Sequence, residues 1–198
     1  MVCSAVAGIF HEISFAARIA GNVLSGNCWR YAPWNAGGPA PWGSFCGQIT
    51  LSTSQNVTVE GNVITVDPGP GGGVYNAVTM YQDTRGVDHS TSPNVTYRLR
   101  DNAVRNNTIT FKKGSTGHIR LGIMRFTNQS ASVGPEWDLA NITYDGNDYV
   151  LEDAADLGDS AFWWCEGGDH CPKIRGHTFA EFQNLGQERG GTWTAKHA

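Results

Sequence analysis

Apolar and polar residues alternate along the chain in short runs, and turn-forming residues separate these runs. Examples are residues 9–12, 49–52, 78–81 and 119–121, each of which begins with a β-branched Ile or Val. Short alternating runs bounded by Gly, Asn, Ser and Pro are typical of β-strands. No helical period of useful length interrupts them. The pattern therefore predicts an all-β fold.

An internal repeat organises these strands. Its marker is an Asn that recurs after 40, 45 and 40 residues, at Asn22, Asn62, Asn107 and Asn147. Each unit reads as strand, turn, strand, Gly-Asn corner, strand and variable loop. Because one unit cannot bury its own apolar face, we expect the units to stack in parallel, with the Asn side chains hydrogen-bonded in one column. This register places residue 9 over residues 49, 78 and 119.

Three segments resemble the C-terminal part of right-handed parallel β-helix repeat proteins, which are bacterial extracellular proteins related to pectate lyases. They are residues 8–22 (GIFHEISFAARIAGN), 54–62 (SQNVTVEGN) and 179–187 (FAEFQNLGQ). The expected fold is an all-β, right-handed parallel β-helix (solenoid) of about four coils over residues 1–151. Residues 152–198 depart from the repeat. We expect them to cap the last coil, with a short helix over residues 178–185 that begins near Thr178 or His177.

Composition narrows the choice of partners. Charged residues make up 16% of the chain and the net charge is -4. There is no basic field to attract a phosphate backbone, so we expect no nucleic acid partner. No apolar run reaches the ~18 residues of a membrane helix, so we expect no membrane partner. We expect no cofactor and no metal.

The chain has five cysteines, an odd number. Two pairs bracket loops rich in Gly, and we expect disulfides between Cys28 and Cys46 and between Cys165 and Cys171, with Cys3 left over. The competing interpretation is a zinc site built from Cys165, His170, Cys171 and His177, although this spacing matches none of the common structural zinc patterns. Disulfides indicate an oxidising compartment, so we expect an extracellular or secreted protein, with no signal peptide recognisable in the first residues.

The register also predicts which side chains face outward from the first strand of each unit. These are Phe10, Glu12, Thr50, Ser52, Thr79, Tyr81 and Arg120, with Asp83 and Arg85 at a strand end, whereas His11 points into the core. The resemblance implies a substrate groove on this face. Our candidate catalytic residues are Glu12, Tyr81, Asp83 and Arg120, and our candidate substrate-binding residues are Arg85, His118, Trp34 and Trp42.

Each candidate has a chemical role in that groove. Arg120 or Arg85 would pair with a sugar carboxylate, Tyr81 or Trp34 would stack on a ring, and Glu12 or Asp83 would move a proton. The alternative is that these polar residues only keep the outer face soluble, and that the tryptophans pack their loop against the stack.

Two functions follow from these features. The first is an extracellular polysaccharide-acting protein of the lyase or glycoside hydrolase type, with an acidic polysaccharide favoured. The second is a non-catalytic carbohydrate-binding or structural solenoid, which could be part of a longer chain. At the N-terminal end we expect Ile9, His11 and Ile13 to face water, so that the first coil docks on upstream coils or meets a second copy end to end.

Overall fold

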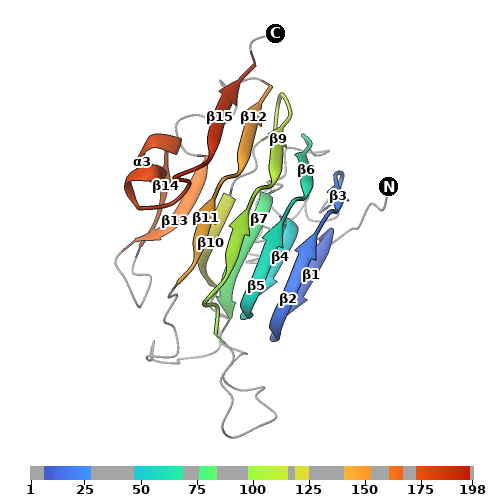
Figure 1. Ribbon diagram of the computed structural model, residues 1–198, viewed down its shortest axis with the longest axis vertical. Coiled ribbons are helices and arrows are strands. Elements are labelled where there is room, and N and C mark those ends of the chain that lie inside the picture. Colours follow the sequence, from blue (N-terminus) through green and yellow to red (C-terminus); the bar gives the residue numbers. More distant parts are fainter. Residues whose placement is uncertain are drawn as a thin grey trace, which may run out of the picture.

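The computed structural model describes residues 7–27, 47–68, 76–83, 98–115, 119–124, 141–152, 161–166 and 173–196. These residues form mostly β-strands, arranged in three sheets with parallel pairing, and a six-residue helix (Figure 1). From β1 to β12, successive strands of the chain join different sheets, and each set of three lies beside the next set. The predicted β class is confirmed.

The first sheet, sheet A, has the order β1-β4-β7-β10-β13-β14. Its strands pair in parallel, except that β14 is antiparallel to β13. Residue 9 pairs with residue 49, as the Asn spacing of 40 predicts, and residue 49 pairs with residue 78, as the alignment of the first strand of each unit predicts. The strands are β1 (Ile9–Glu12), β4 (Gly47–Ser52), β7 (Asn76–Asp83), β10 (Ile119–Met124), β13 (Phe162–Glu166) and β14 (Lys173–His177).

The other two sheets are parallel throughout. Sheet B has the order β11-β8-β5-β2 and sheet C the order β15-β12-β9-β6-β3. The strands of sheet B are β2 (Phe15–Ala20), β5 (Gln55–Glu60), β8 (Ala103–Arg105) and β11 (Thr143–Asp145). Those of sheet C are β3 (Val23–Leu24), β6 (Val63–Val66), β9 (Thr108–Phe111), β12 (Asp148–Leu151) and β15 (Thr192–Ala195).

The core collects the alternate side chains of all three sheets. Fully buried members include Leu51 from sheet A, Val59 from sheet B and Ile64 from sheet C. Burying an aliphatic side chain of this size stabilises a fold by about 1.5–3 kcal/mol. Because each unit contributes only short strands, this core exists only when units are stacked.

The corner between sheets B and C needs a left-handed backbone. The residue before each marker Asn has a φ of 54° to 68°, namely Gly21, Gly61, Asn106 and Gly146. Glycine adopts this conformation without steric cost, and Asn tolerates it better than most residues. The repeat therefore keeps a Gly or Asn at this position.

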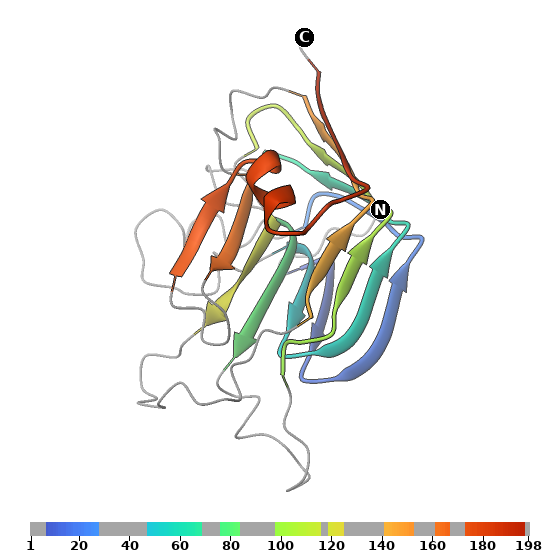
Figure 2. The same ribbon diagram turned by 60° about the vertical axis from the view of Figure 1, so that its left-hand side comes forward.

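The predicted C-terminal helix is confirmed as α3 (Phe179–Asn184), with Thr178 as its N-cap. The Thr178 hydroxyl accepts a hydrogen bond from the Glu181 amide, and the Glu181 carboxylate accepts one from the Thr178 amide, which is a capping box. The ring of Phe182 stacks on that of Phe162 with a centroid distance of 4.5 Å. The helix thus covers the last sheet strands (Figure 2).

The C-terminal part also continues the repeat, although we expected residues 152–198 to depart from it. Strand β13 pairs in parallel with β10, and β15 pairs in parallel with β12, so sheets A and C both extend beyond the fourth unit. Sheet A also gains the antiparallel strand β14. Sheet B gains none, because β11 is its last strand. The segment after α3 lies against β11 instead, where the Glu188 amide donates to the Tyr144 carbonyl.

Candidate binding face

Over β4 and β7, the outer side of sheet A is not the open face that the sequence predicts, whereas Phe10 on the edge strand is 44% exposed as expected. Tyr81 is 1% exposed, and Thr50, Ser52 and Thr79 are buried as well. All six residues of β4 are buried, so both sides of this strand are covered. Alternation along a strand decides which side of the sheet a residue occupies, but burial depends on what packs against that side. The expected exposure of Tyr81 is therefore wrong.

The candidate Glu12 and its neighbour His11 are half-buried at this edge of the sheet. Glu12 accepts a hydrogen bond from the Ser52 hydroxyl at 3.4 Å. His11 is paired through Nδ1 with the Ser54 hydroxyl at 2.9 Å, and burial lowers the pKa of its imidazole. The expectation was a core histidine hydrogen-bonded to the backbone, whereas His11 is half-buried and its ring pairs with a side-chain hydroxyl.

The remaining candidates cannot be placed with their side chains. Asp83 and Arg120 lie in β7 and β10, where Arg120 pairs with Thr79 and Asp83 with Met124, but their side chains are outside the described part of the structure. For Arg85, His118, Trp34 and Trp42, both backbone and side chain lie outside the described residues. Their proposed roles stay predictions.

The cysteine predictions are also largely outside the described residues. Cys165 lies in β13, whereas Cys3, Cys28, Cys46 and Cys171 are not described, so both disulfide pairings stay predictions. His170 of the alternative zinc set is not described either. Within the described ranges, no cluster of three or more His, Cys, Asp or Glu residues could hold a metal ion.

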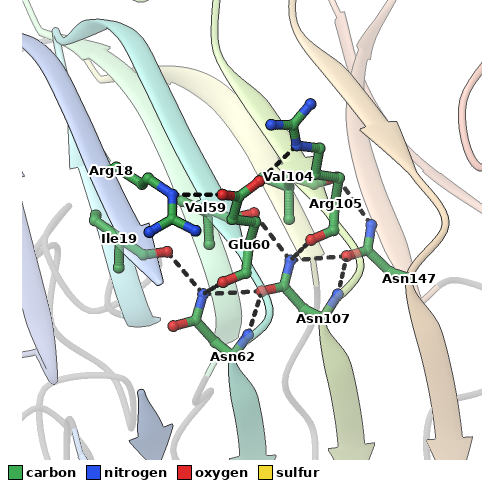
Figure 3. A network of polar contacts seen from close by, with 9 residues as sticks. All are labelled: Arg18, Ile19, Val59, Glu60, Asn62, Val104, Arg105, Asn107 and Asn147. Atoms are coloured by element: carbon green, nitrogen blue, oxygen red, sulfur yellow. Dashed lines mark hydrogen bonds and ion pairs between the residues drawn. The ribbon is translucent and has the colours of Figure 1, made fainter. Parts of the chain in front are cut away.

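The marker asparagines form the predicted column (Figure 3). The Oδ1 atom of Asn107 accepts from both the backbone N and the Nδ2 of Asn62, each at 2.9 Å. Asn147 accepts from the corresponding two atoms of Asn107 at 3.0 and 2.8 Å, and Asn62 from those of Asn22 at 2.9 Å. Within the column, each amide therefore donates to the next unit, and Asn62, Asn107 and Asn147 each accept from the Asn of the preceding unit.

The column ends at Glu188, which no sequence signal had singled out. This carboxylate is fully buried and accepts from Asn147 Nδ2 at 2.7 Å and from the Tyr149 hydroxyl at 2.6 Å. Burial raises the pKa of Glu188, and its hydrogen bonds to Tyr149 and Asn147 partly oppose this. A carboxylate offers acceptors but no amide donor, so the chain of hydrogen bonds stops here.

Directly beside the column, the outer face of sheet B carries a group of three charges, which we call the arginine clamp (Figure 3). Glu60 Oε1 pairs with Arg18 Nε at 2.5 Å, and Glu60 Oε2 pairs with Arg105 Nε at 2.7 Å. The Arg18 and Arg105 side chains are 70% and 53% exposed, whereas that of Glu60 is 17% exposed. The hydrogen bonds from Arg105 and then Arg18 lower the pKa of Glu60.

The clamp leaves most of its donors available. Only the Nε atoms contact Glu60, so among the described residues the Nη atoms of Arg18 and Arg105 have no partner. A guanidinium can bind a carboxylate through two parallel hydrogen bonds. The two arginines come from strands on either side of β5, so they lie about two strand spacings, or about 10 Å, apart along the stacking direction.

The sequence contained the signal for part of this face. Residues 60, 105 and 145 each stand two positions before a marker Asn, and they pair in one row across sheet B. This places Glu60 next to Arg105 without any structure. The contribution of Arg18 could not be read in this way, because it reaches Glu60 diagonally from the level of Thr58.

Comparison with known proteins identifies no relative. Neither a family model, nor a curated protein, nor a solved structure matches the chain. In the described part of the chain, no helix has the length and apolar character of a membrane span.

Proposed function

We propose that this chain is a right-handed parallel β-helix that binds an acidic polysaccharide on the outer face of sheet B and does not cleave it. The proposed fold is supported by the three sheets, in which strands three apart in chain order are neighbours, and by the column of corner asparagines. A right-handed path is the one that parallel strand crossovers favour.

The observation that carries the proposed ligand is the arginine clamp. The carboxylate of Glu60 neutralises one of its two guanidinium charges, so the group keeps a net charge of about +1. Its outward donors repeat along the direction in which the strands stack. A linear polymer with carboxylates at regular intervals can therefore lie across the strands and bind both arginines at once.

The proposed absence of turnover rests on what the described carboxylates do. Each is already bound to a structural partner: Glu60 to two arginines, Glu188 to the end of the Asn column, and Glu181 to the helix N-cap. The others are Glu12, Asp67, Asp101, Asp145, Asp148 and Glu152, which accept from side chains or backbone amides. Glycoside hydrolysis needs two carboxyl groups that face one substrate bond, and the described residues contain no such pair.

The test is a binding titration with polygalacturonate and with an uncharged dextran, by calorimetry at low and at moderate salt. The wild type should bind the polyuronate, more weakly as salt increases, and should not bind dextran. Arg18→Ala and Arg105→Ala should each weaken binding about 10-fold or more, because each removes a charge-assisted contact of about 1.5 kcal/mol. Glu60→Gln should tighten binding at low salt, since it removes the competing carboxylate.

The matched control is Arg175→Ala, which removes the same charge from β14 on sheet A. It should bind the polyuronate as the wild type does. Equal binding by all the arginine variants would exclude the clamp as the site. The same incubations should be assayed for new reducing ends and for unsaturated sugars. Either product would show that the protein is an enzyme, and Asp83 and Arg120 would then be the first candidate catalytic residues to replace.

A further inference from the structure

The two ends of the stack are built differently, and the C-terminal end is closed by side chains. On the edge strand β11, the Tyr144 amide donates to Gln187 Oε1 at 2.7 Å, and Gln187 Nε2 donates to the Ile142 carbonyl at 3.3 Å. The Glu188 amide donates to the Tyr144 carbonyl at 2.6 Å. A side-chain amide here occupies the donor and acceptor positions of a neighbouring strand, which protects an edge from further pairing.

The apolar core is also covered at that end. Phe182 of α3 is fully buried and lies against the rings of Phe162, Tyr144 and Trp164. The Asn column ends there on the Glu188 carboxylate. The edge of sheet B, the core and the column are therefore all terminated at the C-terminal end.

At the N-terminal end, the edge strands of the three sheets are β1, β2 and β3 (Figure 1). Three apolar inward side chains of these strands are only half-buried, whereas the residues paired with them in the next unit are 0% exposed; a fourth, Ile19 of β2, is buried at 7% exposed. The half-buried residues are Ile9, Ala17 and Leu24, and their partners are Ile49, Val57 and Ile64. The core thus reaches this end of the described structure without the cover that α3 supplies at the other.

The polarity of the Asn column says what kind of group would fit this end. Both hydrogens of Asn22 Nδ2 are used, by Asn62 Oδ1 at 2.9 Å and by the Ala20 carbonyl at 3.2 Å. Its Oδ1 atom accepts from no residue that the structure describes. In each later unit, the same atom accepts from the backbone N and the Nδ2 of the preceding Asn. The end of the column is therefore an acceptor that lacks its donors.

We infer that the end formed by β1, β2 and β3 is a docking surface for one further parallel repeat unit of another polypeptide segment, whose corner Asn donates to Asn22 Oδ1. Such a unit would pair with the three edges and cover Ile9, Ala17 and Leu24. A second copy of this chain fits less well. Its own N-terminal end presents the same acceptor, and its C-terminal end presents a carboxylate under a helix.

The experiment supplies the missing unit from the chain itself. In one variant, residues 47–75 are duplicated directly ahead of Ala7, which is level with Gly47 and Asn76 in the register of sheet A, so that the copied Asn62 comes into line with Asn22. Amide hydrogen exchange in β1 and β2 should slow at least 10-fold, and binding of a hydrophobic dye should fall. The control is the same duplication with Asn62→Asp in the added copy, which retains the acceptor but loses the amide donor, and it should lose most of this protection.

A second probe keeps the test valid if the duplicated variant does not fold. A synthetic peptide of residues 47–68, added in excess to the unaltered protein, should slow exchange in β1 and β2 and leave β15 unchanged. Unchanged exchange with the peptide, or with a folded duplicated variant, would overturn the inference. It would also be overturned if light scattering showed a stable dimer whose exchange in β2 slows as protein concentration rises, because a second copy would then be the occupant.

Discussion

Replacement of Asn107 by Ala tests whether the Asn column holds the stack together. The amide of Asn107 donates to Asn147 Oδ1, to the Val59 carbonyl and to the Arg105 carbonyl at 2.8 to 3.1 Å, and its Oδ1 accepts two hydrogen bonds from Asn62. Asn107→Ala removes all five contacts from a site that is 1% exposed. It leaves the backbone N–H of Asn62 buried without its acceptor.

The magnitude follows from these contacts. Five hydrogen bonds contribute roughly 0.5–1.5 kcal/mol each, and leaving a buried amide unsatisfied costs roughly 1–3 kcal/mol. Because some of these contacts share a donor or an acceptor, we expect a loss of about 4 kcal/mol in the free energy of unfolding. Asn22→Ala makes the same chemical change at the half-buried end of the column, where only two side-chain hydrogen bonds are lost and water can replace them. It should cost about 1 kcal/mol.

The measurement is urea unfolding followed by tryptophan fluorescence, with the dependence on urea compared between variants so that a change in midpoint reports stability. The comparison of the two variants carries the test, because both remove the same side chain. Equal losses at Asn107 and Asn22, or a loss below about 1 kcal/mol at Asn107, would show that the column contributes little and that the apolar core alone stabilises the stack.

Three further predictions address other parts of the chain. Burial raises the pKa of Glu188, so the contribution of Glu188 to stability is complete below the carboxyl pKa of the unfolded chain and is lost as pH rises through the higher folded pKa. Glu188→Gln should therefore flatten the pH dependence of the melting temperature between these two pKa values. An unchanged pH profile in this variant would contradict the prediction. Thr178→Ala removes the capping box of α3 and should cost about 1 kcal/mol, with Thr178→Ser as the conservative control. Peptide mapping by mass spectrometry without reduction should find Cys3 free and two disulfides, and any other linkage would refute the pairing of Cys28 with Cys46 and of Cys165 with Cys171.

Much of the fold could be read from the sequence because its determinants are local and repeated. The spacing of the marker asparagines sets the register of sheets B and C and of the first strand pair of sheet A, where residue 9 pairs with residue 49. A Gly or Asn at each corner marks the left-handed turn. The capping box at Thr178 begins α3 as its residue types indicate. Each of these features depends on a few neighbouring residues and on a period, both of which a sequence displays.

The candidate site was less predictable, because it depends on contacts between units and on what covers a surface. Glu188 lies 41 residues after Asn147, close to the repeat period, but a change of residue type hides it from a search for Asn. Arg18 and Arg105 share Glu60 only because stacking brings three separate strands side by side.

The sequence by itself determined the direction in which each side chain leaves its strand, since alternation and register follow from backbone geometry. Only the tertiary structure decided which of those directions lead to solvent. Tyr81 and Thr50 are buried on the outer side of sheet A, whereas Arg18 and Arg105 are exposed on the outer side of sheet B. The physical reason is that burial is a property of everything packed around a residue, and that packing involves segments far apart in the chain.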